Sequence, residues 1–338
     1  MNLKFLRHTI YILNIGMLIL ILGCKSHKGD FSTDSNLKTQ PWTHTAFDAS
    51  EEKFSFAVFS DLTGGERENI FEAGVSQINL MRPEFIVNVG DLIEGAEKDA
   101  TVWNAQWDSF DERAKKARAP IFYTGGNHDL TGNLAHAIWK ERYGPSFYHF
   151  IYKNTLFLIL DTEDHIAARH DELEAIRNEA IIVYKTKGVE AYKQTEYANL
   201  PEQKWGDISR SQSDYFISVI EDNPSVTWTF LLLHKPIWEN SKSTNFNTIE
   251  KALNGKNYTV FNGHTHLYKH TKRLGQDYIN LATTGGKQFP ERGLSFDHFL
   301  WVTVDNNEVS LANLKMSGVL DKQGKLPVHL NTDNKTDK

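Results

Sequence analysis

Residues 258–266 read Tyr-Thr-Val-Phe-Asn-Gly-His-Thr-His, an apolar run that ends in two histidines separated by one residue. Two imidazoles placed this way after a strand are best explained as metal ligands, with a pair of surface histidines as the alternative. Four other β-like runs also end in polar residues, which are Asp61-Leu62-Thr63, Gly90-Asp91, Gly126-Asn127-His128-Asp129 and His234. Taken together, these motifs decide the fold and the chemistry that the sequence predicts.

The apolar runs alternate with helical patterns along the chain. Residues 54–59, 85–89 and 121–123 read as strands, and residues 70–80 and 102–117 between them read as helices. This alternation predicts an α/β sheet core with parallel pairing.

The second half of the chain departs from this alternation in two places. Residues 162–208 form a highly charged, helical insertion that is either a decoration or a lid near the site, and a helix at 209–220 leads back to the core. The short runs at 278–281, 299–304 and 309–311 predict an added antiparallel portion.

Each polar motif follows a strand, so its side chains are expected at the carboxyl edge of the sheet, where open α/β sheets bind ligands. The donors in question are the carboxylates of Asp61 and Asp91, the amide of Asn127, and the imidazoles of His234, His264 and His266. Singly, an aspartate after a strand reads as a turn residue, and His234 reads as a buried core histidine. As a set, these nitrogen and oxygen donors suit Zn, Mn or Fe better than a soft metal ion.

The five motifs in this order resemble the calcineurin-like metallophosphoesterase superfamily, over roughly residues 54 to 305. The resemblance implies two packed mixed β-sheets flanked by helices, in an α/β fold. It also implies that Asp61, Asp91 and His266 bind one metal. The second metal is then bound by Asp91, which is shared, and by Asn127, His234 and His264.

The resemblance further implies that His128 lies beside the leaving group and that Asp129 orients it. We expect His128 to protonate the leaving oxygen, because the pKa of an imidazole lies near the working pH. The superfamily has a histidine where this chain has Thr63, which we expect to be a weak or water-mediated ligand. His298 is a candidate substitute for the missing histidine, with a structural histidine as the alternative. Further candidates for phosphate contacts are the amides of Gly64 and Gly65 and the charges of Lys235, Lys287 and Arg292, with ordinary turn and surface roles as the alternatives.

We therefore expect a metal-dependent phosphoric ester hydrolase that uses two divalent or trivalent ions (Mn, Fe or Zn). Water activated by these ions would attack a phosphate mono- or diester of a small molecule. The alternative is a catalytically inactive metal-binding lipoprotein, which the loss of the histidine at Thr63 suggests.

The amino terminus predicts export. Lys4 and Arg7 precede an apolar stretch from Ile10 to Leu22, which is too short for a lasting membrane span and typical of a signal peptide at residues 1–23. The ending Ile21-Leu22-Gly23-Cys24 resembles the bacterial lipobox, in which the cysteine becomes lipidated. A plain cleaved signal is the alternative. We expect a protein of the bacterial cell envelope that is anchored to a membrane through Cys24.

The remaining organisation follows from composition. Residues 24–52 read as a polar tether, 53–315 as the catalytic domain and 316–338 as a polar tail. The 338-residue chain has 40% hydrophobic residues, a net charge of −6 and a single cysteine. This composition predicts a globular core and excludes a disulfide within the chain. Because no basic surface is indicated, no nucleic-acid partner is expected.

Overall fold

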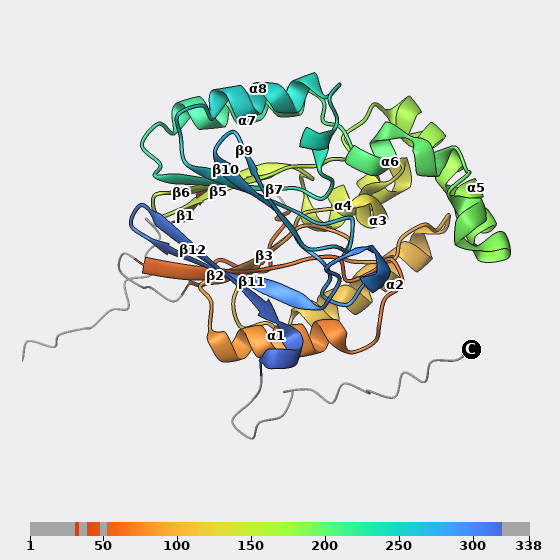
Figure 1. Ribbon diagram of the computed structural model, residues 1–338, viewed down its shortest axis with the longest axis horizontal. Coiled ribbons are helices and arrows are strands. Elements are labelled where there is room, and N and C mark those ends of the chain that lie inside the picture. Colours follow the sequence, from red (N-terminus) through yellow and green to blue (C-terminus); the bar gives the residue numbers. More distant parts are fainter. Residues whose placement is uncertain (1–30, 34–38, 48–52, 320–338) are drawn as a thin grey trace, which may run out of the picture.

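The computed structural model describes residues 31–33, 39–47 and 53–319 (Figure 1). The expected signal peptide, Cys24 and residues 320–338 lie outside this range. Two mixed sheets form the centre. The seven-stranded sheet has the order β1 (Phe31–Thr33), β5 (Tyr148–Tyr152), β6 (Thr155–Ile159), β7 (Trp228–Leu232), β8 (Tyr258–Asn262), β10 (Gln276–Asn280), β9 (Lys269–Arg273). The five-stranded sheet has the order β12 (Glu308–Lys315), β11 (His298–Asp305), β2 (Lys53–Phe59), β3 (Phe85–Asn88), β4 (Ile121–Phe122).

Both sheets combine parallel and antiparallel pairing. Strands β2, β3 and β4 are parallel, as are β6, β7, β8 and β10. Strand β11 pairs antiparallel with β2 and β12, and β9 pairs antiparallel with β10. Of the runs predicted as an added antiparallel portion, 299–304 and 309–311 do pair antiparallel as β11 and β12, whereas 278–281 forms β10, which pairs parallel with β8 and antiparallel with β9.

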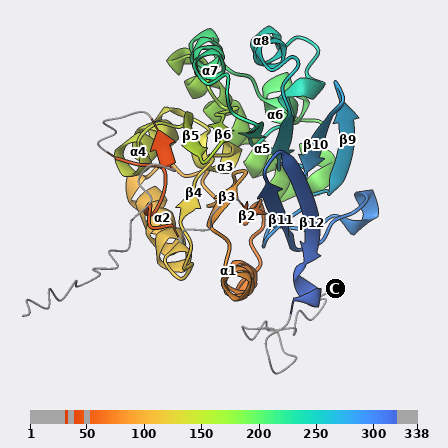
Figure 2. The same cartoon turned by 90° about the vertical axis from the view of Figure 1, so that its left-hand side faces the viewer.

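Helices cover the outer face of each sheet, so the molecule has four layers (Figures 1 and 2). Helices α1 (Ile70–Met81) and α2 (Ala100–Ala114) lie on the five-stranded sheet, with α3 (Asn127–Leu130) and α4 (Asn133–Tyr143) beyond β4. Helices α7 (Arg210–Asp222) and α8 (Thr244–Ala252) lie on the seven-stranded sheet. The predicted architecture of two packed mixed sheets flanked by helices is confirmed.

Strand β2 shows why the layers form. Its side chains alternate, as they do in any strand. Phe54, Phe56 and Val58 point into the core between the sheets, whereas Ala57 and Phe59 point into the core beneath the helices. A strand that is apolar on both faces must be covered on both faces, which requires a second sheet on one side and helices on the other.

The insertion at residues 162–208 is helical, as expected. It contains α5 (Ala167–Tyr192), the 3₁₀ turn η1 (Tyr197–Asn199) and α6 (Pro201–Trp205). Helix α5 is interrupted at Gly188, which has φ 81°. Three further 3₁₀ turns are η2 (Ile237–Glu239), η3 (Pro290–Arg292) and η4 (Met316–Gly318). Within the described residues, no helix combines the length and the apolar content that crossing a membrane requires.

Two segments expected to be free of the domain pack against it. In the expected tether, β1 pairs with β5, and Trp42 is 5% exposed with its ring 5.6 Å from that of Phe122. Phe31 and Phe47 extend the same aromatic cluster, which is why a segment of polar composition still attaches. In the expected tail, Met316 is buried and its carbonyl accepts a hydrogen bond from Gln77.

The packing of the expected tether can be tested at Trp42. Replacing a buried tryptophan with alanine removes a large apolar contact and typically costs about 3–5 kcal/mol. We expect Trp42→Ala to lower the free energy of unfolding, measured by denaturant titration, toward the low end of this range because the indole N–H has no hydrogen-bond partner. The exposed Thr45→Ala is the control. Equal stability of the two variants would contradict the packing.

Candidate metal centre

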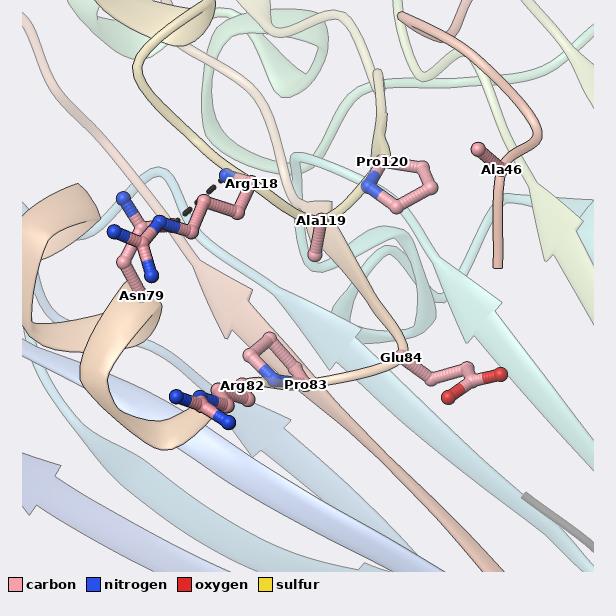
Figure 3. Close-up of a pocket in the computed structure, with 8 residues that line it drawn as sticks. All are labelled: Ala46, Asn79, Arg82, Pro83, Glu84, Arg118, Ala119 and Pro120. Atoms are coloured by element: carbon pink, nitrogen blue, oxygen red, sulfur yellow. Dashed lines mark hydrogen bonds between the residues drawn. The ribbon is translucent and has the colours of Figure 1, made fainter. Parts of the chain in front are cut away.

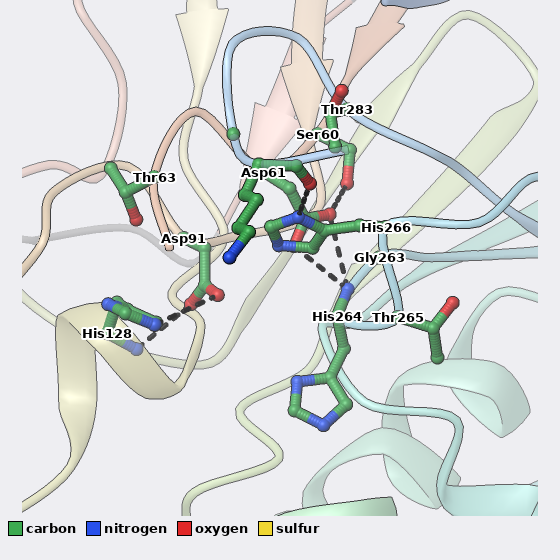
Figure 4. Close-up of polar contacts among 12 residues, drawn as sticks. Ser60, Asp61, Thr63, Asp91, His128, Gly263, His264, Thr265, His266 and Thr283 are labelled. Atoms are coloured by element: carbon green, nitrogen blue, oxygen red, sulfur yellow. Dashed lines mark hydrogen bonds and ion pairs between the residues drawn. The ribbon is translucent and has the colours of Figure 1, made fainter. Parts of the chain in front are cut away.

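The ligand candidates leave their strands in an unusual backbone conformation. Asp61, Asp91, His264 and His266 have φ values of 47°, 59°, 74° and 57°. Residues other than glycine rarely adopt this left-handed region, which costs about 1–3 kcal/mol for each residue and occurs most often at functional sites. The chain turns sharply at the end of β2, β3 and β8, and the side chains of Asp61, Asp91 and His266 point toward one another (Figure 4).

Asp61, Asp91 and His266 form a group able to bind one cation. One ligand atom from each side chain lies within 4.8 Å of the others, and all three residues are buried. The Nε2 atom of His266 is 3.3 Å from Oδ1 of Asp61. These are the residues expected at the first metal, and the structure brings them together.

The residues expected at the second metal meet on the other side of Asp91. The Nε2 atom of His234 is 3.2 Å from Oδ2 of Asp91 and 3.2 Å from Oδ1 of Asn127. The ring of His264 lies 5.1 Å from that of His234, and its backbone N–H donates to Asp61. Asp91 therefore lies between the two groups, in the shared position that the sequence predicts.

The outer nitrogens of two histidines fix how their rings face the centre. The Nδ1 atom of His234 donates to the carbonyl of Val89 at 2.8 Å, and Nδ1 of His266 donates to the carbonyl of Lys287. Because a carbonyl only accepts, each Nδ1 carries a proton and each Nε2 is available to a metal. This arrangement is the usual support for metal-binding histidines. The donors of the first group fit a cation. At the second group, Asp91, Asn127 and His234 lie within contact of one another and the ring of His264 lies beside that of His234, so the types of donor that a second cation needs are present.

Glycines allow the close approach of these motifs. A Cβ atom on Gly126 would lie 2.3 Å from Oδ1 of Asp91, and one on Gly263 would lie 2.3 Å from Oδ2 of Asp61. Any larger residue at either position would displace a carboxylate of the centre. The glycines that precede Asn127 and His264 are thus part of the site.

Buried carboxylates and imidazoles alter one another's protonation. Burial alone would raise the pKa of Asp91, but the neighbouring His234 and His128 hold it well below its usual range. Burial would lower the pKa of His234, but the charge of Asp91 raises it to about 9. The pKa of His266 is also raised, because Asp61 outweighs burial. In the metal-free protein, protons on histidine thus balance the charge that metal ions balance when bound.

His128 lies at the edge of the centre, where Glu94 orients it and not Asp129. Its Nδ1 donates to the carbonyl of Glu94 at 2.6 Å and is 3.8 Å from the Glu94 carboxylate, while Nε2 is 4.0 Å from Oδ2 of Asp91. Asp129 instead accepts hydrogen bonds from the backbone N–H groups of Leu92, Ile93 and Gly126. The prediction that Asp129 orients His128 is wrong, because its carboxylate is used to hold the loop of Asp91. Glu94 follows Asp91 by three residues, and no motif in the sequence marked it.

The two residues considered at the weak first motif have structural roles. Thr63 is buried, and its hydroxyl donates to the carbonyl of Ile93 at 2.9 Å. His298 accepts from the N–H of Ala282 and donates to Asn313, and burial lowers its pKa to about 4. The suggestion that His298 replaces the missing ligand is therefore wrong, since both of its ring nitrogens are already bonded.

Two of the residues considered for phosphate contacts, Lys235 and Gly65, are bonded to other groups of the protein instead. Lys235 is 1% exposed and forms an ion pair with Glu163 at 2.5 Å, so it does not face a substrate. The N–H of Gly65 donates to Glu94, which removes that amide from the proposed phosphate contacts. Lys287 is exposed near His266, and Arg292 lies over the ring of Phe289.

A separate cavity of about 260 Å³ lies at the opposite, amino-terminal edge of β3 and β4 (Figure 3). The residues that line it are Ala46, Asn79, Arg82, Pro83, Glu84, Arg118, Ala119 and Pro120. None of them belongs to the five motifs. The chemistry therefore resides in the cluster around Asp91 and not in this cavity.

Metal affinity should depend on pH. A metal ion at the second group needs a neutral His234, whose pKa in the metal-free protein is about 9. Below that pH a proton competes for Nε2, so affinity should rise about tenfold for each pH unit and level off near pH 9. Competition with a chelator between pH 6.5 and 9.5 measures this. An affinity that does not change over this range would contradict the assignment of His234.

Comparison with known proteins agrees with this geometry. Residues 54–268 match the calcineurin-like phosphoesterase family. No curated protein matches the sequence. Among solved structures, a dimetal phosphatase from Danio rerio is similar with a TM-score of 0.55 and 13% identity, over 79% of this chain and 97% of that one.

Two further structures show the same fold. The purple acid phosphatase PPD1 from yellow lupin is similar with a TM-score of 0.53 and 14% identity, over 81% of this chain and 54% of that one. PhoD is similar with a TM-score of 0.53 and 11% identity, over 78% and 69%. The family match covers more than half of the chain and contains all five motifs. The chain belongs to the calcineurin-like phosphoesterase family of metal-dependent phosphoric ester hydrolases.

Proposed function

We propose that the protein is an exported phosphoesterase, anchored to a membrane of the bacterial cell envelope, that hydrolyses phosphate esters of small molecules. The observation that carries the catalytic part is the grouping of Asp61, Asp91 and His266 within 4.8 Å, with His234 and Asn127 on the other side of Asp91. A mixed set of oxygen and nitrogen donors suits Mn, Fe or Zn.

The residues of the chain divide the chemistry among them. Cations held by Asp61, Asp91, Asn127, His234, His264 and His266 would bind phosphate oxygens and lower the pKa of water toward neutral. Asp91 holds both groups of donors at a fixed separation, because its carboxylate accepts from the N–H of His128 and faces His234. His128 has its Nδ1 committed to Glu94, so a second proton on Nε2 faces the centre and can pass to the leaving oxygen.

The membrane-anchored part of the proposal rests on the amino terminus. Lys4 and Arg7, the apolar run to Leu22 and the lipobox-like ending at Cys24 support export and lipidation. Several acyl chains on one cysteine hold a protein firmly to a membrane, whereas a single chain holds it only marginally. The catalytic domain would then work at a membrane surface on small-molecule substrates, without nucleic-acid partners.

A pair of substrates tests the catalytic proposal. We expect the metal-loaded protein to hydrolyse p-nitrophenyl phosphate or bis-p-nitrophenyl phosphate. His128→Ala should lower kcat on an alkyl phosphate about 10²–10⁴-fold, and much less on the nitrophenyl ester, because an alkoxide needs a proton and a nitrophenolate does not. His270→Ala, at an exposed histidine on β9, is the control. Protein that carries metal but turns over neither ester would favour the inactive metal-binding lipoprotein.

Replacing Cys24 tests the anchor. Because Cys24 is the only cysteine, Cys24→Ala removes every possible site of lipidation on a cysteine. In bacterial cells we expect the wild type to sediment with membranes and to take up labelled palmitate, and the variant to lose the label. Label that persists in the variant would overturn the lipoprotein assignment and leave the metal centre untouched.

A further inference from the structure

Arg177 of α5 is a buried cation that forms no ion pair with a carboxylate in the part of the chain that the structure describes. The residue is only 4% exposed. Glu174, one turn earlier on the same helix, lies close enough for Arg177 to lower its pKa, which burial and Asp171 raise, but it does not come within 4 Å of the guanidinium. The other arginines that pack against the body are each paired, namely Arg67 with Asp297, Arg113 with Glu66, Arg142 with Asp111 and Arg273 with Glu250. Burial of an unpaired charge costs free energy that packing does not return.

Helix α5 carries Arg177 on the face that points toward the body. The buried residues of this helix are His170, Leu173, Arg177 and Ala180, which recur at the spacing of one helical face. Tyr184 continues that face. In Figure 1 the helix lies beside α6, at the end of the molecule where α3 holds Asn127 and His128.

The two ends of this face contact two different segments that adjoin the metal ligands. At one end, the ring of His170 lies 4.2 Å from that of His136 in α4, the helix that follows α3. At the other end, the hydroxyl of Tyr184 accepts a hydrogen bond of 3.1 Å from Lys287, whose carbonyl orients His266. Arg177 is seven residues from each end, or about 10 Å along the helix. It therefore lies midway along the helix between the contact with α4 and the contact with Lys287.

Tyr197 links Arg177 to the centre. This residue of η1 is 6% exposed, and burial raises its pKa to about 12, with Arg177 lowering that pKa and Glu163 and Asp91 raising it. Its hydroxyl is thus within electrostatic reach of both Arg177 and Asp91. The side chain of Arg177 is hydrogen-bonded to this phenol. A neutral phenol does not balance the charge of a guanidinium, and Glu174 interacts with Arg177 without forming an ion pair.

We propose that Arg177 binds the phosphate of the substrate beside the metal centre and that it favours phosphate monoesters over diesters. This assignment rests on the proposed phosphoester hydrolysis. A guanidinium donates two parallel N–H groups to phosphate oxygens, which is the geometry that arginine provides and lysine does not. Helix α5 is then a wall of the active site, not a decoration.

The preference for monoesters follows from counting oxygens and charges. At neutral pH a monoester has three terminal oxygens and about two negative charges, whereas a diester has two terminal oxygens and one charge. The third terminal oxygen is the one available to Arg177 when the others face the centre. A second negative charge also matches the added cation. The buried charge of Arg177 is costly in the free protein and is balanced when a monoester binds.

The test compares Arg177→Gln and Arg177→Lys with Arg169→Gln, in full-length protein of measured metal content. Arg169 is a suitable control because it lies on the same helix and is paired with Glu172 and Glu202. We expect Arg177→Gln to lower kcat/KM for p-nitrophenyl phosphate roughly 10–100-fold and to weaken inhibition by inorganic phosphate by a similar factor. In the same variant, turnover of bis-p-nitrophenyl phosphate should change less than about threefold. The control Arg169→Gln should leave the turnover of both esters unchanged.

Thermal unfolding separates a binding role from a structural one. Removal of an unpaired buried charge should leave the melting temperature of Arg177→Gln equal to or above that of the wild type. A lower melting temperature with equal losses on both esters would show that Arg177 only holds the helix, and would overturn the proposal. If Arg177→Gln does not fold, Arg177→Lys serves in its place. Lysine keeps the positive charge but lacks the two parallel N–H groups of a guanidinium, so it should still reduce the preference for the monoester. An unchanged preference would also overturn it.

Failure of the proposed hydrolysis has a different signature. Wild-type protein that carries metal and turns over neither ester would remove the catalytic proposal. Binding of inorganic phosphate to the same protein, measured by calorimetry, would then still report on Arg177. Loss of phosphate binding in Arg177→Gln supports the assignment, and unchanged binding contradicts it.

Discussion

The buried carboxylate of Asp91 is the constraint on which the rest of the site depends. It lies at the end of β3 in a left-handed conformation, accepts the N–H of His128 and faces His234. Asp61 places a second negative charge in the same small volume. Two buried carboxylates repel each other and lose their hydration, so such a pair persists only where cations surround it. In the metal-free protein, imidazolium groups balance this negative charge. Metal ions balance it more fully, because each carries at least two positive charges.

This constraint involves both sheets at once. Asp61, Asp91 and Asn127 follow strands of the five-stranded sheet, whereas His234, His264 and His266 follow β7 and β8 of the seven-stranded sheet. The distance between these two sets of donors is set by the aromatic core between the sheets, where Phe56 packs edge-on against both Phe157 and Phe230. A bound metal pair therefore joins the two halves of the sandwich. Ligands that bind only the folded state stabilise it, so metal should stabilise the packing of one sheet on the other.

Much of this arrangement was predictable from the sequence, because strands buried on both faces are apolar throughout and the functional residues stand where each apolar run stops. The grouping of Asp61, Asn127, His234 and His266 around Asp91, with the ring of His264 beside that of His234, follows from that pattern. Strand β9, Lys269–Arg273, was missed because an exposed edge strand has no apolar alternation to reveal it. Trp42 was assigned to a tether because a few aromatic residues in a polar segment leave no periodic signal.

The errors within the site have a common cause. A charged residue in a sequence is read as exposed or as functional, and the sequence does not show which buried partner it has. Lys235 looked like a phosphate ligand and is neutralised by Glu163. Asp129 looked like the partner of His128 and holds backbone N–H groups instead. Glu94, in an unremarkable Ile-Glu-Gly stretch, took that role because the chain after Asp91 folds back along the loop of Gly65.

The same reasoning explains why selectivity should come from the insertion and not from the sheets. The donors at the strand ends are all occupied with the metal positions or with one another, and they contact only the group that every phosphate ester shares. A residue that distinguishes substrates must bring an additional charge from outside this set. Helix α5 contacts α4 at one end and Lys287 at the other, and between these contacts it carries the guanidinium of Arg177, which forms no ion pair with a carboxylate in the described residues. Had an acid paired with Arg177, the helix would be more stable and the substrate would gain nothing from it.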